Sequence, residues 1–320
     1  KIIKKGWLKR IVSSVTTIAI IFILTAVVMF PNFKSIPTTG VYSYTSCVLE
    51  LTDLSRMEEL KNDGSPRKLS LLVYYPKEGG ILDNSCPLIV FSHGGISTKT
   101  SNLSLYKELA SHGYVVVSID HTYHALYTKI DGVNITIDPG YMKELSEEDS
   151  HSDLENSYAC FQKWMKLRTD DIHFVIDSFI EQSMSENDSF YSLVDVNRIG
   201  VAGHSLGGSA ALGVGRQRND IKAVIALESP YMCVMNIYSD NGYSLIGTDN
   251  KYVQNKNQLL NNGNTRYYYI EGSNHYTLTD LIRTSPIVCA LLGGRVNKSG
   301  YESLKIVNQK TLAFFDEYVR

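Results

Sequence analysis

The apolar positions of this chain form one long uninterrupted run near its start and a series of short runs beyond it. The long run, IVSSVTTIAIIFILTAVVMF, covers residues 11–30 and contains no charged residue. A helix needs about 20 such residues to cross the roughly 30 Å hydrocarbon core of a bilayer. The pattern therefore predicts one membrane-spanning helix, and no other part of the chain has a comparable run.

The charges around this run predict its orientation. Five basic residues precede it and only Lys34 closely follows it, so the positive-inside rule puts the N-terminus in the cytoplasm and the rest of the chain outside. A cleaved signal peptide, which would give a secreted protein, is the alternative, but MFPNF at residues 29–33 is not a small-residue cleavage site. We expect a basic flank (1–10), a single-pass anchor (11–30), a linker (31–40) and one extracytoplasmic domain (41–320).

Beyond residue 40, short β-branched runs alternate with stretches of helical spacing, which predicts an α/β fold. Near-continuous apolarity is typical of strands covered on both faces, as in a mostly parallel central sheet. Residues 129–155 fit neither pattern, and we expect a solvated loop or, alternatively, a lid over a site. The predicted strands begin at Leu69, Pro87, Tyr114, Arg198, Ile221, Met232 and Arg266, and the predicted helices cover residues 103–112, 157–180, 206–216, 251–260 and 301–318.

Composition narrows the function classes. The chain has 320 residues, with 31 Lys and Arg against 33 Asp and Glu, and this balance excludes an electrostatic nucleic-acid binder. Its five cysteines are dispersed, so neither a disulfide framework nor a zinc cluster is indicated. His121 and His124 form H-x-x-H after a predicted strand, and without a third clustered ligand we expect loop histidines near a pocket mouth. The sequence implies no metal and no organic cofactor.

One motif carries specific chemistry. GHSLGG at residues 203–208 fits G-x-S-x-G between a predicted strand and a predicted helix, the context in which a nucleophilic serine is presented on a sharp turn. Glycines on both sides let the backbone close up, because a Cβ there would obstruct the turn. Ser205 is the predicted nucleophile.

A serine nucleophile needs a base and an acid, which follow it in this order: nucleophile, acid, histidine. His275 is the one histidine C-terminal to Ser205, so it is the predicted base. Glu228 and Asp240 each end a predicted strand, where sites of open α/β sheets gather. Position alone leaves these two carboxylates nearly tied as the acid.

Negative charge that develops on a substrate carbonyl needs backbone N–H donors. The residue after the serine, Leu206, supplies one. SHGG at residues 92–95 is similar to the H-G-G-type loop that follows an early strand of such enzymes. Gly95 is therefore the predicted second donor.

These motifs resemble the α/β-hydrolase fold, and in particular the platelet-activating factor acetylhydrolase family of the plasma type (lipoprotein-associated phospholipase A2), in the form of a membrane-anchored bacterial relative. The resemblance runs from about Thr39 to the C-terminus and rests on TGVY, LLVYYP, VFSHGG, LASHGY, GHSLGG, ALES and GSNHYTLTDL. It implies that Glu228 is the acid, with Asp240 as the alternative, although the family has Asp at the matching position.

The resemblance implies a serine carboxylic-ester hydrolase that acts through an acyl-enzyme. Its expected substrates are phospholipids or related esters with a short acyl group. The alternatives are a broad small-ester or dienelactone-type hydrolase, and a catalytically dead hydrolase fold that serves as a binding module. The expected partners are an ester substrate and the membrane.

Overall fold

A central eight-stranded sheet organises the computed structural model of this chain, which describes residues 2–61, 63–77, 83–149, 152–185, 190–229, 242–247, 265–294 and 296–320. Its strand order is β1-β2-β4-β3-β7-β8-β9-β10. Antiparallel pairing joins β1 to β2 and β2 to β4, and every other pair is parallel. The strands are β1 (Tyr44–Met57), β2 (Pro66–Pro76), β3 (Cys86–Ser92), β4 (Val115–Asp120), β7 (Val194–His204), β8 (Ile221–Leu227), β9 (Gly242–Gly247) and β10 (Thr265–Tyr269).

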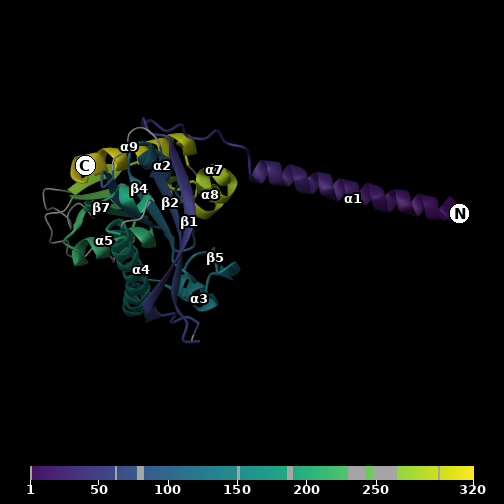
Figure 1. Cartoon of the computed structure of the whole chain (residues 1–320). Coiled ribbons are helices and arrows are strands. Elements are labelled where there is room, and N and C mark those ends of the chain that lie inside the picture. The colour runs from purple at the N-terminus through teal and green to yellow at the C-terminus, as the bar shows by residue number, and fades with distance from the viewer. Residues whose placement is uncertain are drawn as a thin grey trace.

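Helices cover both faces of this sheet (Figure 1). On one face, α4 (Leu154–Ser183) and α5 (Leu206–Gln217) pack against the strands, and on the other α2 (Leu103–Ser111) and α9 (Gly300–Tyr318) do so. Every residue of β3 and β4 is buried. Their near-continuous apolar runs are typical of strands in a sheet whose two faces are both covered by helices. The predicted mostly parallel α/β architecture is confirmed.

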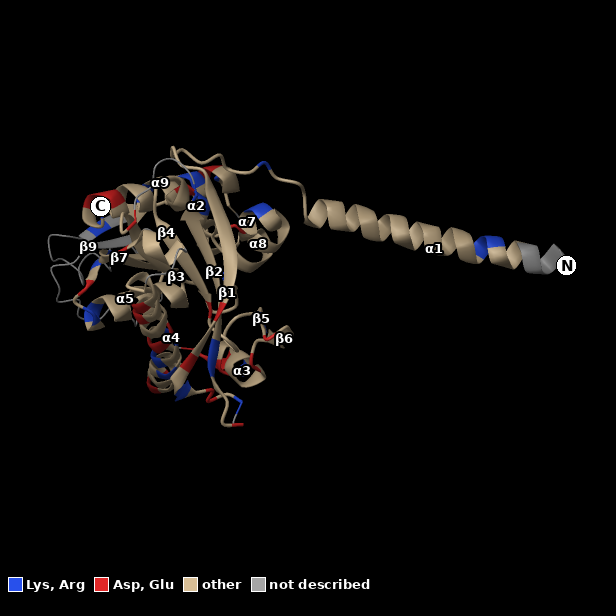
Figure 2. Cartoon of the chain, viewed as in Figure 1, with Lys and Arg blue, Asp and Glu red and all other residues tan. Residues whose placement is uncertain are grey.

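The long apolar run forms the helix α1 (Ile2–Met29), which projects from the domain (Figure 1). Its segment Gly6–Met29 is long and apolar enough to cross a membrane, with a mean hydropathy of 2.5 and none of its most apolar window buried in the protein. Figure 2 shows Lys and Arg near the start of α1 and uncharged residues along the rest. The predicted helix is present, and its length and composition fit either a membrane anchor or a signal sequence.

Several elements differ from the sequence-based expectation. The edge strand β1 was not predicted, because its half-buried and exposed positions alternate instead of forming an apolar run. Residues 129–155 are no plain loop: the hairpin of β5 (Tyr127–Ile130) and β6 (Val133–Thr136) leads into α3 (Pro139–Glu147). The short helices α7 (Leu281–Thr284) and α8 (Pro286–Gly293) were also missed. The predicted strand at 232–240 and helix at 251–260 lie outside the described residues, whereas β9 occupies a segment with no predicted element.

Candidate active site

Ser205 occupies a strained turn between β7 and α5. Its backbone φ is 54° and its ψ is −125°, a conformation that costs free energy for any residue with a Cβ. The turn is tight, because a Cβ on Gly203 would overlap the backbone of Gly207. The Ser205 N–H donates to the Leu227 carbonyl at 2.8 Å, which ties the turn to the end of β8. The predicted strand, turn and helix are therefore all in place.

His275 lies beside this turn because its own loop is held by hydrogen bonds. It begins the short 3-10 helix η3 (His275–Leu278), whose N-cap Asn274 accepts from two backbone N–H groups. The ring centroids of His275 and His204 are 4.4 Å apart, and His204 Nε2 donates to the His275 carbonyl at 3.0 Å. Since His204 immediately precedes Ser205, these contacts place the predicted base next to the turn that carries the predicted nucleophile.

Glu228 also adopts an unusual backbone conformation. It follows β8 with a φ of 47°, in the left-handed region that non-glycine residues seldom occupy. Its Oε2 lies 3.6 Å from His275 Nδ1, and the two side chains are 14% and 33% exposed. This separation is an ion-pair distance and is longer than a hydrogen bond. The structure therefore brings Glu228 to His275, while Asp240, the alternative acid, lies outside the described residues.

The residues that carry the two predicted oxyanion donors, Leu206 and Gly95, also lie close together. Leu206 begins α5, so its N–H belongs to the unsatisfied first turn, where the helix dipole favours negative charge. A Cβ added to Gly95 would lie 3.1 Å from Leu206 Cδ1, and one on Gly94 would lie 3.5 Å from Ser205 Cβ. The loop after β3 thus lies against the turn that carries the nucleophile.

His121 and His124 lie in the loop after β4, as expected, and their side chains are buried there, at 0% and 3% exposure. His121 contacts the Ser92 hydroxyl at 2.8 Å through Nε2 and the Asp171 carboxylate at 2.9 Å through Nδ1. Burial is the main reason that the pKa of His121 is lowered to about 4. The signal that could have revealed this pairing is Asp171, a charged residue between the apolar positions of a predicted core helix.

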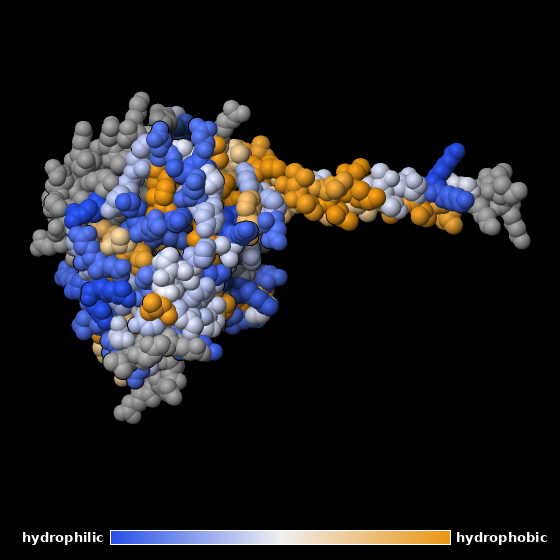
Figure 3. Space-filling model, turned by 90° about the horizontal axis from the view of Figure 1, so that it is seen from above, coloured by the Kyte–Doolittle hydropathy of each residue, from blue (hydrophilic) through white to orange (hydrophobic). Residues whose placement is uncertain are grey.

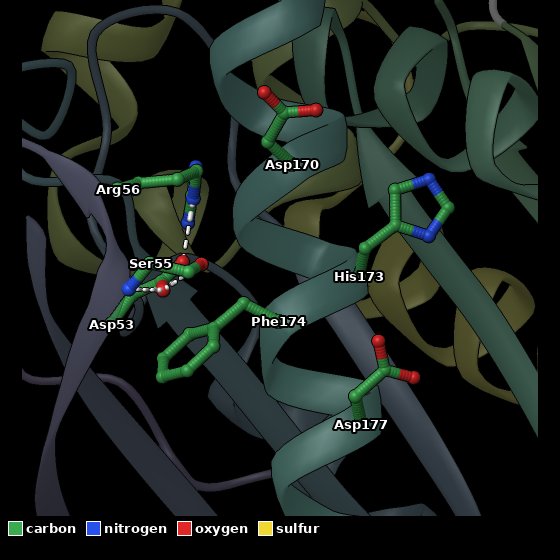
Figure 4. Close-up of a pocket in the computed structure, with 7 residues that line it drawn as sticks. All are labelled: Asp53, Ser55, Arg56, Asp170, His173, Phe174 and Asp177. Carbon is green, nitrogen blue, oxygen red and sulfur yellow. Dashed lines mark hydrogen bonds and ion pairs between the residues drawn. The ribbon is translucent and has the colours of Figure 1, made fainter.

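An open hollow between β1 and α4 contains charged groups but shares no residue with the predicted site (Figure 4). Its carboxylates have partners: Asp53 pairs with Arg56 at 2.6 Å and Asp177 pairs with Arg218 at 2.7 Å. Among the described residues, no group of three or more His, Cys, Asp or Glu side chains could hold a metal ion.

Comparisons with known proteins match several parts of this chain. Residues 78–134 match the family model "Platelet-activating factor acetylhydrolase, isoform II", and residues 162–279 match the "PET hydrolase-like" model. Platelet-activating factor acetylhydrolase of Cavia porcellus is 21% identical over 73% of this chain and 57% of its own length. Cutinase est1 of Thermobifida alba is 28% identical over 48% of this chain, and the matched segment spans only 38% of that cutinase.

A solved structure supports the fold independently. The ferulic acid esterase from Streptomyces cinnamoneus superimposes with a TM-score of 0.66 at 21% identity, over 89% of this chain and 92% of that one. At this identity the likeness concerns the fold. With the family models, it confirms that the chain has the α/β-hydrolase fold and is related to the platelet-activating factor acetylhydrolase family.

Proposed function

We propose that this chain is a serine carboxylic-ester hydrolase. The observation that carries the proposal is the strained Ser205 turn, with His275 beside it and Glu228 3.6 Å from His275. The relatives support it, since their names describe a cutinase, a ferulic acid esterase and an acetylhydrolase. Strain of this kind persists where the surrounding structure enforces it, and it is concentrated at functional sites.

In this mechanism the Ser205 hydroxyl attacks the ester carbonyl while His275 takes its proton. The carbonyl π electrons move to oxygen, and the resulting oxyanion is bound by the N–H groups of Leu206 and Gly95. The tetrahedral intermediate then expels the alcohol, which His275 protonates, and water hydrolyses the acyl-enzyme by the same steps. Glu228 orients the imidazole and offsets its positive charge.

For the substrate we propose phospholipids or related esters with a short acyl group. The relation to platelet-activating factor acetylhydrolases supports this choice. A broad small-ester hydrolase is the second candidate, and the cutinase and ferulic acid esterase relatives favour it. Hydrolysis of a phospholipid with a 2-acetyl group, a phospholipid with two long chains and p-nitrophenyl acetate separates the two. A rate that falls from the acetyl to the long-chain phospholipid supports our proposal, whereas turnover of p-nitrophenyl acetate alone supports the second candidate.

We further propose that α1 anchors the enzyme in a bilayer with the hydrolase domain on the extracytoplasmic side. The domain lies close to the end of α1, because the Ser285 hydroxyl donates to the Met29 carbonyl at 2.6 Å. Apolar side chains continue from α1 onto the adjoining domain surface (Figure 3). On α8, Leu291 and Leu292 are 77% and 59% exposed. An ester site held next to a membrane would have direct access to lipid.

Fractionation tests this placement. The full chain should remain with membranes after carbonate extraction, since a spanning helix is inserted in effect irreversibly. Protease added to spheroplasts should digest the hydrolase domain. Protection from that protease would reverse the proposed orientation, and a soluble protein with a new N-terminus after Phe30 would establish secretion.

A fluorophosphonate probe separates an enzyme from an inactive binding module. Phosphonylation requires an activated serine, so we expect labelling of Ser205 in the wild-type chain. An unlabelled Ser205 in folded protein would reject the hydrolase proposal.

A further inference from the structure

Arg168 is a charged side chain in the core of the domain. It lies on α4, is 0% exposed, and is among the largest fully buried side chains of the described residues. A buried guanidinium is expensive unless it is paired and fully hydrogen-bonded. Among the residues that the structure describes, no carboxylate lies within ion-pair distance of it, and its Nε has no hydrogen-bond partner. Stability alone gives little reason for an arginine at this position.

The hydrogen bonds of Arg168 go to the loop that follows β3. One guanidinium N–H donates to the His93 carbonyl at 2.6 Å and another to the Gly94 carbonyl at 3.2 Å. The next carbonyl, that of Gly95, accepts from the Tyr141 hydroxyl at 3.1 Å. Three successive carbonyls of this loop are therefore held by side chains of α4 and α3.

Holding a carbonyl also fixes an N–H group. The Gly94 carbonyl and the Gly95 N–H belong to one planar peptide unit, and in a trans peptide they point in opposite directions. A bond from Arg168 to the Gly94 carbonyl therefore turns the Gly95 N–H away from the guanidinium. It also polarises that unit, because hydrogen bonds in a chain strengthen one another. Gly95 is the residue whose N–H we assign to the oxyanion.

The neighbouring residues support the same orientation. His93 Nδ1 also donates to the Gly94 carbonyl, at 2.6 Å, so that oxygen has two donors. Tyr141, 3% exposed, is fixed by stacking on His124 with ring centroids 3.8 Å apart and by an edge contact with Trp164. Below the loop, Ser92 is tied through His121 to Asp171, one turn after Arg168 on the same helix. The loop has little freedom to turn its carbonyls toward the site.

We propose that Arg168 is a positioning residue for ester hydrolysis, which aligns and polarises the Gly94–Gly95 peptide so that its N–H binds the oxyanion, with Tyr141 fixing the next peptide. This inference rests on the proposed function, because it concerns the same site. Arg168 is distant from Ser205 in the sequence, and its side chain would act on the reaction through the backbone of the loop after β3.

The test compares Arg168→Met with Arg168→Lys in the detergent-solubilised full chain. Methionine keeps much of the apolar volume but donates nothing, while lysine keeps the charge and can replace one of the two bonds. For p-nitrophenyl acetate we expect kcat to fall about 10- to 100-fold in Arg168→Met, because slight misplacement of an oxyanion donor has effects of that size. KM should stay within about twofold, and Arg168→Lys should recover part of the loss. Arg218→Met is the matched control, since Arg218 pairs with Asp177 and Asp220 instead of the loop.

A second measurement separates positioning from a structural role. An alkyl trifluoromethyl ketone accepts the Ser205 oxygen at its carbonyl carbon, the carbonyl electrons move to oxygen, and His275 takes the serine proton. Its inhibition constant therefore reports oxyanion binding, and it should rise by the same factor by which kcat falls. Guanidinium ions added to Arg168→Ala should restore part of the activity. An inhibition constant equal to the wild-type value would overturn the proposal, as would a kcat within twofold of wild type.

Two controls keep the outcomes distinct. Wild-type protein that is not labelled at Ser205 by a fluorophosphonate would reject the proposed function itself, whereas labelled wild type with an unaffected Arg168→Met rejects only the role of Arg168. Tyr141→Phe removes the single hydrogen bond from the Tyr141 hydroxyl to the Gly95 carbonyl. This variant replaces the arginine variants in the test if those do not fold. It should lower kcat about fivefold and weaken ketone binding in parallel. Ketone binding that is unchanged in Tyr141→Phe would then overturn the proposal.

Discussion

Ser92 and Ser205 each lie at the C-terminal end of a central strand, and each belongs to a group that also contains a histidine and a carboxylate. In the first group, Ser92 contacts His121 at 2.8 Å and His121 contacts Asp171 at 2.9 Å, with all three side chains fully buried. In the second group, His275 lies 3.6 Å from Glu228 and both side chains are partly exposed. The residue types are nearly the same, but the first group is shielded from solvent and the second is open to it.

The difference shows that a nucleophilic serine needs access to substrate in addition to a nearby histidine and carboxylate. Asp171 is held by the guanidinium groups of Arg67 and Arg56 at 2.7 and 3.0 Å, and Arg67 with the His121 hydrogen bond keeps the pKa of its carboxyl well below the usual range. A fully hydrogen-bonded group without solvent access is rigid and cannot receive a substrate. Ser205, in contrast, is pushed out of the strand by its strained turn. We therefore assign structure to the first group and chemistry to the second.

Replacing each serine by alanine should give the largest difference between the two groups. We expect Ser205→Ala to lose about 10⁶-fold in kcat, as removal of a nucleophilic serine does in such triads. Ser92→Ala should keep fluorophosphonate labelling at Ser205, and its unfolding free energy should fall by about 1–3 kcal/mol because the buried Nε2 of His121 loses its hydrogen-bond partner. Ester assays, mass spectrometry of the labelled serine and urea unfolding measure these effects. Labelling of Ser92 in the Ser205→Ala chain would contradict the assignment.

The carboxylates offer the next test. Glu228→Gln should lower kcat about 10³- to 10⁴-fold, because an amide no longer holds the required imidazole tautomer. Asp240→Asn should be mild. The Glu228→Asp variant, which carries the residue of the acetylhydrolase family, tests whether the side-chain length matters at a 3.6 Å separation from His275. A larger loss in Asp240→Asn than in Glu228→Gln, measured as kcat on p-nitrophenyl acetate, would move the acid to Asp240.

Much of this arrangement could be predicted because it depends on residues that are close together in the sequence. The apolar runs of the buried strands predicted β2, β3, β4, β7 and β8, and the glycines around Ser205 predicted the sharp turn. The edge strand β1 was missed because one of its faces is in solvent and its pattern alternates. Elements of this kind depend on neighbours that are distant in the sequence.

The first group, that of Ser92, His121 and Asp171, could not be predicted for the same reason. Ser92, His121 and Asp171 are 29 and 50 residues apart, and polar side chains in short runs look like ordinary loop residues. Arg168 is equally ambiguous, because helical spacing alone does not reveal that its charge points at backbone carbonyls. Only the packing of α4 on β3 and β7 shows which polar side chains are buried and what they contact.

The smallest expected effect is a pH dependence of stability that belongs to the buried group. The pKa of His121 is lowered to about 4, mainly by burial, while in the unfolded chain a histidine titrates near its ordinary value of about 6.5. Between these two values the unfolded chain binds a proton that the folded chain does not, so stability falls on acidification, by up to about 1.4 kcal/mol per pH unit for each such group. Burial lowers the pKa of His93, His124 and His204 in the same direction. Urea unfolding at pH 7.5, 6.0 and 5.0 should show this slope in wild type and in Ser205→Ala alike, and His121→Gln should lower it by one proton. An equal slope in His121→Gln would show that His121 is charged in the folded protein.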